Sequence, residues 1–473
     1  MIKSKNKGVI TTYVLVFGSI FVLLLTGILT FILLQLRQSE QKVSWNQALE
    51  IAEAGMNYYA WCLNNEAEDN CLTEVDIEDA LGNIMGTAVL DVDSEVYCGV
   101  ISSRTITSTG STVKYPNVDR TIRAVYARES VASFAYLLND NVWAGPDREI
   151  RGIYHSNGGI RMDGENQSLV ASNKEEWVCT DSFGCDSCPT SAGCRYEHWE
   201  CICPGVFTTT ENSNSDLFDY PSDYFDFDGI TIDLGEIKEL VDGYPQQYYW
   251  PPVTDLNENG DGYHIKFLND GTFEVWIITR LNRVYGYNDE EGWHYDYFVI
   301  DSEYRYTSPI AIDNSCPVIF VEDNLWLEGE VKGKITIASA DLIHTSGETD
   351  IIIEGDINYT TLDGSDGLGV IAERNILIPP DSPNQLEMRG IYIAQKGRFG
   401  RNHYDSNIRD KLEVYGSIVS NGRVGTQWTS SGHIVSGYST RENYNDSNLV
   451  YNPPPFISSV TSEFKIVNWE EVE

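Results

Sequence analysis

Six cysteines crowd into one short stretch of the chain, and their spacing offers two kinds of chemistry. They are Cys179, Cys185, Cys188, Cys194, Cys201 and Cys203. Zinc coordination needs two close pairs that converge on one ion. Only Cys185 and Cys188 have the usual spacing, with Cys201 and Cys203 a poor second pair near His198. Oxidation to disulfides needs only crowding in an oxidising compartment. We therefore expect three disulfide bonds whose pairing the sequence leaves open, with a metal site as the alternative.

The other four cysteines can also form disulfide bonds. Cys62 and Cys71 are near enough in sequence to close a small loop, whereas Cys98 and Cys316 either pair or remain free. An even total of 10 cysteines is typical of chains that fold where thiols are oxidised. We therefore expect the bulk of the chain to lie outside the cytoplasm.

An acidic turn offers a second candidate site. Residues 255–262 read DLNENGDG, which places oxygen side chains at alternating positions before a glycine, as in the first half of a calcium loop. The position that requires a bidentate glutamate holds Lys266 instead, and no flanking helices are evident. We expect a plain turn and no cofactor. Calcium is the alternative, with these four candidate ligands: Asp255, Asn257, Asn259 and Asp261.

Catalytic motifs are absent from the sequence. It has no G-x-S-x-G elbow, no H-E-x-x-H pair, no phosphate-binding loop and no dinucleotide-binding glycine motif. Its 7 histidines are scattered, and His155 and His344 fall within predicted rungs, where a hydrogen-bonded structural role is expected. We therefore expect that the protein is not an enzyme.

The overall charge excludes several partners. The chain has 32 Lys+Arg against 71 Asp+Glu, a formal net charge of −39. Nucleic acids and anionic membrane surfaces bind basic patches, so neither is an expected ligand of this surface.

The elements that position these residues begin with an uncharged, apolar run from Gly8 to Leu36, preceded by Lys3, Lys5 and Lys7. As a helix the run would be ~44 Å long, which exceeds the ~30 Å hydrocarbon core of a bilayer. A cleaved secretory signal would have a shorter apolar region and a small-residue cleavage site. We expect a retained single span, with the lysines inside and the rest of the chain outside.

An amphipathic stripe follows the apolar run. Apolar and small residues recur at steps of three and four from Trp45 to Tyr59, and no proline interrupts the chain before Tyr115. The pattern predicts one helix from about Val9 to Cys62.

Residues 7–31, KGVITTYVLVFGSIFVLLLTGILTF, followed by ALEIAEAGMNYY at residues 48–59, resemble PilX-type minor pilins and pilus assembly proteins. The resemblance covers about the first 60 residues. It implies prepilin-type cleavage between Gly8 and Val9. It also implies partners among other pilins and the inner-membrane assembly machinery. Tyr13 departs from major pilins, which carry glutamate there, and its presence points to a tip, initiating or membrane-retained subunit.

Short sequence repeats recur in the part of the chain that follows the predicted helix. GIYHSNGGI at residues 152–160 matches GSIVSNGRV at 416–424, and RGIYIAQKG at 389–397 is a third relative. Short strands with repeated glycine corners predict stacked rungs, so we expect a right-handed parallel β-helix-like ectodomain. An ordinary β-sandwich is the alternative.

These patterns predict a mainly β protein with a long N-terminal helix, in four segments. Residues 1–62 form the leader and the transmembrane and amphipathic helix, and 63–175 contain the first rungs. Residues 176–315 are a Cys-rich, acidic insertion with a hairpin turning at residues 269–271, and 316–473 form the solenoid and tail.

We expect a membrane-anchored, cell-surface minor pilin-like protein that primes or caps a pilus or displays its ectodomain for adhesion. The alternative is a free-standing anchored surface protein whose β-helix binds or cleaves polysaccharide.

Overall fold

The computed structural model describes residues 7–65, 70–230, 232–242, 248–256, 258, 260–344, 348–430 and 432–472. This part of the chain is mainly β with one long N-terminal helix, which confirms the predicted class. Two compact units are present. The first takes the chain up to Ser94, then Arg104–Tyr126 and the end from Phe464 on, and the second takes Glu95–Ser103 and Ala127–Glu463. These limits differ from the four predicted segments because the end of the chain returns to the sheet of the first unit.

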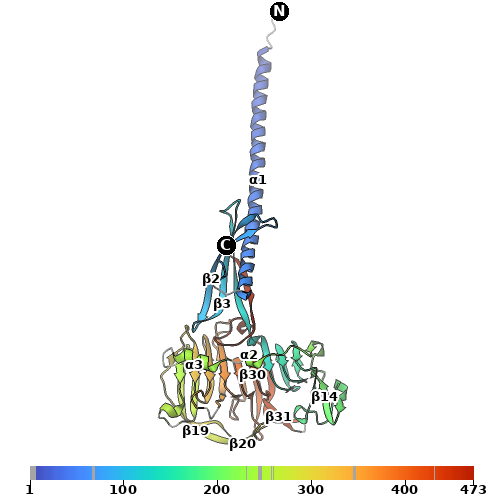
Figure 1. Ribbon diagram of the computed structural model, residues 1–473, viewed down its shortest axis with the longest axis vertical. Helices are drawn as coiled ribbons and strands as arrows, with labels where there is room; N and C mark the ends of the chain where they lie inside the picture. The colour runs from blue at the N-terminus through green and yellow to red at the C-terminus, as the bar shows by residue number, and fades with distance from the viewer. Residues whose placement is uncertain are drawn as a thin grey trace, which may run out of the picture. The chain divides into compact units, whose positions relative to one another are not determined.

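The first unit is built on helix α1 (Lys7–Asn65), a continuous helix of 59 residues. Figure 1 shows its C-terminal half beside strands β2 and β3. A five-stranded sheet has the order β1-β2-β3-β4-β33. Its strands are β1 (Glu74–Glu78), β2 (Ile84–Tyr97), β3 (Val100–Thr112), β4 (Asp119–Ser130) and β33 (Ser459–Val472).

The predicted amphipathic stripe of α1 forms the core of this unit. Ala52, Met56 and Tyr59 pack with Leu90 of β2 and Ile106 of β3. The helical period of three to four residues turns these side chains to one face, so the helix buries a single stripe against the sheet.

The second unit is a stack of strands joined by parallel pairing. One ladder has the order β17–β22–β24–β26–β28–β30–β5–β8–β11–β16. Its strands are β17 (Tyr249–Trp250), β22 (Val318–Val321), β24 (Lys334–Ser339), β26 (Gly367–Ala372), β28 (Gln385–Ala394), β30 (Ile408–Ser420), β5 (Phe134–Leu138), β8 (Ile153–Ser156), β11 (Val170–Ser172) and β16 (Phe218–Asp219).

A second parallel ladder has the order β18–β23–β25–β28–β30–β32–β7–β10. Its further strands are β18 (Gly262–Leu268), β23 (Leu325–Val331), β25 (Ile351–Tyr359), β32 (His433–Tyr444), β7 (Arg148–Arg151) and β10 (Glu165–Asn166). Shorter ladders use β27 (Ile376–Leu377) with β29 (Phe399–Gly400), and β6 (Val142–Ala144), β9 (Ile160–Met162) and β15 (Val206–Phe207). Stacked rungs require parallel pairing of this kind between successive strands. The right-handed β-helix itself stays a prediction.

The chain enters the stack in its middle. From β5 the chain runs through β8 to one end of the stack. It then passes to the opposite end, where β17 pairs with β22. The later strands fill the stack back to β30, which pairs with β5. Inward side chains of successive rungs therefore share one core, which contains Tyr136, Tyr154, Tyr392 and Ile418.

The internal sequence similarity has a structural counterpart in the corner glycines. Gly390 and Gly416 are in register on β28 and β30, with φ of 142° and 140°. Gly152, which precedes β8, has φ of 138°. Side chains rarely adopt this conformation, so glycine permits the repeated corner.

Much of the predicted insertion belongs to the stack, since β17 and β18 pair in parallel with β22 and β23. The hairpin predicted at residues 269–271 is confirmed and joins β18 to β19 (Thr272–Asn288). β19 then pairs with β20 (Gly292–Arg305) and β21 (Ile310–Ala311). The remaining elements are β12 (Glu176–Val178), β13 (Arg195–Glu197), β14 (Glu200–Pro204), α2 (Phe227–Ile230), α3 (Leu234–Asp242) and β31 (Gln427–Ser430).

Candidate functional site

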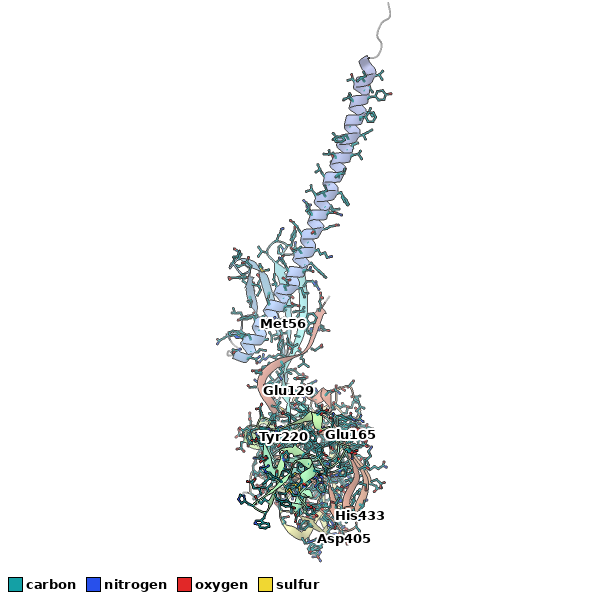
Figure 2. All side chains as sticks on the ribbon, turned by 90° about the vertical axis from the view of Figure 1, so that its right-hand side faces the viewer. Met56, Glu129, Glu165, Tyr220, Asp405 and His433 are labelled. Atoms are coloured by element: carbon teal, nitrogen blue, oxygen red, sulfur yellow. A yellow bond between two sulfur atoms is a disulfide. The ribbon has the colours of Figure 1, made fainter. Side chains whose placement is uncertain are left out.

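The N-terminal half of α1 is an exposed apolar surface. From Val9 to Leu36 its large side chains are exposed, for example Phe21 at 65 % and Leu23 at 73 %. Figure 2 shows side chains projecting from both sides of this part of the helix. The Thr26 hydroxyl donates to the Val22 carbonyl over 2.7 Å, so this polar group is satisfied within the helix. By length and composition α1 can cross a membrane.

The predicted processing residues lie at the start of this helix. Gly8 is in the first turn of α1, and Val9 is 52 % exposed. Tyr13, at the position where major pilins have glutamate, is 61 % exposed. Lys3 and Lys5 lie outside the described residues.

The small residues of the Ala-Glu-Ala-Gly element allow α1 to approach the sheet closely. A Cβ atom on Gly55 would overlap the Cβ of Ala88, and one on Gly110 would overlap the backbone of Ala52. The Ser108 hydroxyl donates to the Ala52 carbonyl over 2.8 Å. Larger side chains at these positions would push the helix off the sheet, because a packed interface cannot absorb the added volume.

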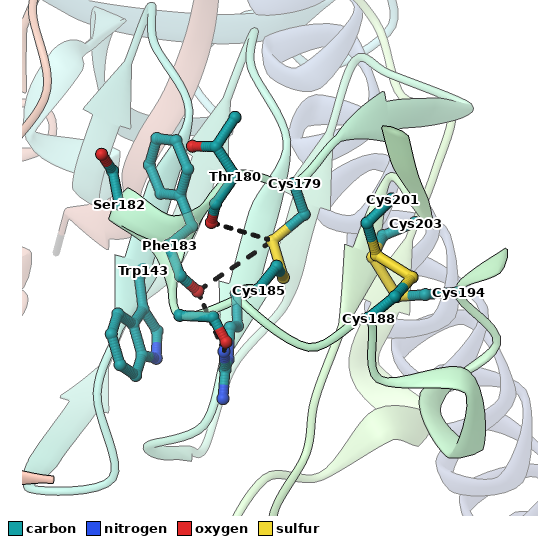
Figure 3. The surroundings of a disulfide bond; sticks show 12 residues. Trp143, Cys179, Thr180, Ser182, Phe183, Cys185, Cys188, Cys194, Cys201 and Cys203 are labelled. Carbon is teal, nitrogen blue, oxygen red and sulfur yellow. Dashed lines mark hydrogen bonds between the residues drawn. A yellow bond between two sulfur atoms is a disulfide. The ribbon is translucent and has the colours of Figure 1, made fainter. Parts of the chain in front are cut away.

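The six crowded cysteines form three disulfides, Cys179–Cys185, Cys188–Cys201 and Cys194–Cys203 (Figure 3). All six are buried and make a small core with Trp177, Phe183 and Phe207. The short strands β12, β13 and β14 around them form a separate three-stranded sheet. Crosslinks therefore supply most of the core of this stapled segment, residues 176–207.

Two further disulfides lie elsewhere. Cys62 bonds to Cys71 near the C-terminal end of α1, with a Cα–Cα distance of 5.7 Å. Cys98 bonds to Cys316, two residues that the sequence left either paired or free. Their separation of 218 residues explains why no local pattern indicates the bond.

The structure describes two of the four candidate calcium ligands, Asp255 and Asp261. Asp255 lies in a short 3₁₀ turn, and the backbone of Asp261 donates to the Ile278 carbonyl over 2.8 Å. Asn257 and Asn259 lie outside the described residues. Among the residues that are described, the sets of three or more potential ligands close enough to share an ion consist of cysteines, and all of those are in disulfides.

The two histidines singled out in the sequence have different surroundings. His155, on β8, is 2 % exposed and packs edge-on against Phe134 and Phe225. Burial lowers its pKa, which favours the neutral form of the ring. His344 lies in the loop after β24, half exposed and near Asp341.

A carboxylate cluster lies on the outer face of β18, β20, β23 and β25. Lys266 lies within 3.0 Å of Glu303 and 3.1 Å of Glu328. Burial, with the charges of Asp381, Glu328 and Glu303, raises the pKa of Glu354 to about 8. Burial opposes ionisation of Glu303 too, but His264 and Lys266 outweigh it and lower that pKa. The cluster is thus an ion-pair network with one protonated acid beside it.

A cleft of about 430 Å³ in the second unit was missed by the sequence analysis. Its lining includes Tyr287 at the end of β19 and Trp428 on β31. The available signal was the aromatic alternation of Tyr285, Tyr287, Trp293, Tyr295 and Tyr297 on the two arms of one hairpin. Trp428 carries no comparable pattern, and only the fold brings it to the hairpin.

Comparisons with known proteins give little. The chain matches no protein family profile and no curated protein. Among solved structures it is similar to the competence-associated pilin ComZ from Thermus thermophilus. The identity is 13 % and the TM-score 0.30, over 91 % of this chain and 97 % of that one. A TM-score this low carries no argument about fold or function.

Proposed function

We propose that this chain is a minor pilin-like structural protein, anchored in a membrane by α1 and used in assembling a type IV pilus-like fibre. The observation that carries the proposal is the contrast between the two halves of α1. The first half is apolar and exposed on all sides, whereas the second is fixed to its own sheet by small residues. Such a helix can move from lipid into a bundle of like helices without disturbing the unit that it carries.

The resemblance of residues 7–59 to PilX-type minor pilins supports this function. Tyr13 in place of glutamate supports a minor rather than a major subunit. In an apolar helix bundle a glutamate would need the α-amino group of a neighbour as its partner. A priming or capping subunit has no ordinary neighbour at that position, so replacing the glutamate with tyrosine loses no ion pair.

The proposed topology is a single span with the sheet and the stack outside. The lysines that precede the apolar run favour this orientation, and the five disulfides fit an oxidising compartment. The partners are other pilins and the inner-membrane assembly machinery. The outer unit serves priming, capping or adhesion, without catalysis and without a cofactor.

Photo-cross-linking in cells that assemble the fibre tests this proposal. A photo-reactive residue at Phe21 should form adducts with other proteins that carry a pilin-type helix. The same residue at Trp199, on the stapled segment, is the control and should not form those adducts. Phe21 adducts with lipid alone, in cells that carry assembled fibres, would contradict the proposal.

A further inference from the structure

The cleft of the second unit is assembled from segments that are far apart in the sequence. Its lining residues come from the tip of the β19–β20 hairpin, the stapled segment and the turn before β31, among other segments. Residues that line it include Asp140, Phe183, Tyr287, Arg398, Arg423 and Trp428. A concave site with a few polar groups around aromatic rings is the usual form of a ligand site.

Arg423 fixes one wall of the cleft. Its guanidinium donates to the Asp289 carboxylate over 2.8 Å and to the Ser182 carbonyl over 2.6 Å. The same group lies 4.3 Å from the centre of the Phe183 ring. One side chain thus ties the hairpin tip to the stapled segment, so the wall is formed before any ligand arrives.

The floor of the cleft is aromatic and held by backbone bonds. Tyr287 and Trp428 have ring centroids 5.5 Å apart. The Trp428 indole N–H donates to the Arg401 carbonyl over 2.9 Å, and the backbones of Tyr287 and His403 exchange hydrogen bonds of 3.0 and 2.8 Å. The rings are therefore positioned independently of a ligand.

The aromatic surface continues out of the cleft along the hairpin. Trp293 lies 5.5 Å from Tyr287 and stacks on Tyr285 at 5.3 Å, and Tyr285 lies 5.0 Å from Tyr295. Cross-strand pairing of Tyr287 with Trp293 and of Tyr285 with Tyr295 places these rings on one face. Tyr285, Trp293 and Tyr295 are each about half exposed, at 51 %, 51 % and 50 %. A continuous exposed aromatic strip of this kind marks an interaction site.

The polar groups around these rings indicate the chemistry of the ligand. Asp140 and Glu290 contribute carboxylates to the lining, and Arg398 and Arg423 contribute guanidiniums, so donors and acceptors are mixed around the rings. A pyranose ring has apolar C–H groups on its faces and hydroxyls around its edge, which suits aromatic faces flanked by mixed polar groups. The net charge of −39 disfavours polyanions, including acidic polysaccharides.

We propose that the cleft and the aromatic strip bind a chain of neutral sugars, with successive rings on Trp428, Tyr287 and Trp293. The binding itself does not depend on α1. Its use in adhesion rests on the proposed function.

The test uses the full-length protein in detergent micelles with three neutral probes: cellohexaose, mannohexaose and chitohexaose. Titration calorimetry should show saturable binding of at least one. Trp293→Ala should weaken that binding about tenfold or more, as for an aromatic anchor that the ligand covers, and Trp293→Phe should keep most of it. Trp199→Ala is the matched control, since Trp199 is 99 % exposed on the stapled segment, and it should leave binding unchanged.

The inference is overturned if none of the three probes binds, or if Trp293→Ala binds as the parent does. Binding of only polygalacturonate, or of only a proline-rich peptide on the same rings, would also overturn it. Melting curves of the variants separate lost binding from lost folding. Failure of membrane anchoring or of fibre assembly leaves this result untouched, so the two proposals fail separately.

Discussion

The folded structure raises the pKa of the Glu354 carboxyl group, and this shift makes a testable prediction about stability. Its Oε2 atom is buried and has no hydrogen-bond partner among the described residues. Burial first, then nearby carboxylates, raises its pKa from 4.5 to about 8. The folded state therefore keeps a proton that the unfolded state releases, and the stability due to this group is lost as pH rises from about 4.5 through about 8.

Glu354→Gln should remove this dependence, because the amide keeps the shape without the charge. We expect the variant to be more stable than the parent at pH 8.5, by roughly 1–3 kcal/mol, and about equal at pH 4. Urea unfolding at both pH values measures the difference. Glu211→Gln, at an exposed position, is the control and should change neither. An equal effect of Glu354→Gln at the two pH values would refute the assignment.

Gly55 tests the close approach of helix and sheet. Gly55→Leu should push α1 away from β2 and destabilise the first unit by about 1–3 kcal/mol. Hydrogen–deuterium exchange of peptides from β2 and β3 should become faster. Glu53→Leu, on the exposed face of the same helix, adds the same side chain and should leave exchange unchanged. Unchanged exchange in both variants would contradict the packing described here.

At the scale of elements, the stapled segment depends on its crosslinks. The double variant Cys188→Ser/Cys201→Ser removes a disulfide between cysteines 13 residues apart in sequence. Its loss should lower the stability of this segment by up to about 3 kcal/mol. Limited proteolysis should then cut within residues 176–207. Cys62→Ser/Cys71→Ser, which removes a disulfide of the first unit, should leave that segment resistant. Equal resistance of all three proteins would mean that the crosslinks are dispensable.

The corner glycines make a second prediction for the stack. A Cβ on Gly416 would overlap the carbonyl of Gly390, and its φ of 140° is strained for any other residue. Gly416→Ala should therefore destabilise the protein by about 1–3 kcal/mol, seen as a lower melting temperature. Gly425→Ala is the control, because a Cβ there meets nothing within 4 Å. Equal melting temperatures would contradict the assigned corner.

Sequence could predict elements whose signal is local. The apolar run, the stripe on α1, the hairpin at residues 269–271 and the repeated glycine corners each rest on neighbouring residues. The pairing of β5 with β30 could not be predicted, because Leu137 and Val419 meet only when the whole stack has formed. The bond between Cys98 and Cys316, and the meeting of Tyr287 with Trp428, are set by the same long-range packing.

At the scale of the whole molecule, different parts of one chain carry different proposed functions. In the proposed function, the apolar half of α1 anchors the protein and takes part in assembly. The sheet packs against the other half of that helix, and the stack carries the proposed binding surface. The sequence indicated the first of these through the resemblance of residues 7–59 to minor pilins. It could not indicate the third, because the lining of the cleft comes from five separate segments of the chain.

The most direct test of the central claim is the mass of the N-terminal peptide of the protein taken from its native membrane. We predict that the mature chain begins at Val9, which would place it in the pilin pathway although Tyr13 replaces glutamate. The intact mass, measured before and after reduction, should also rise by about 10 Da for five disulfides. A chain that still carries the residues up to Gly8 would contradict a fibre subunit and leave an anchored surface protein.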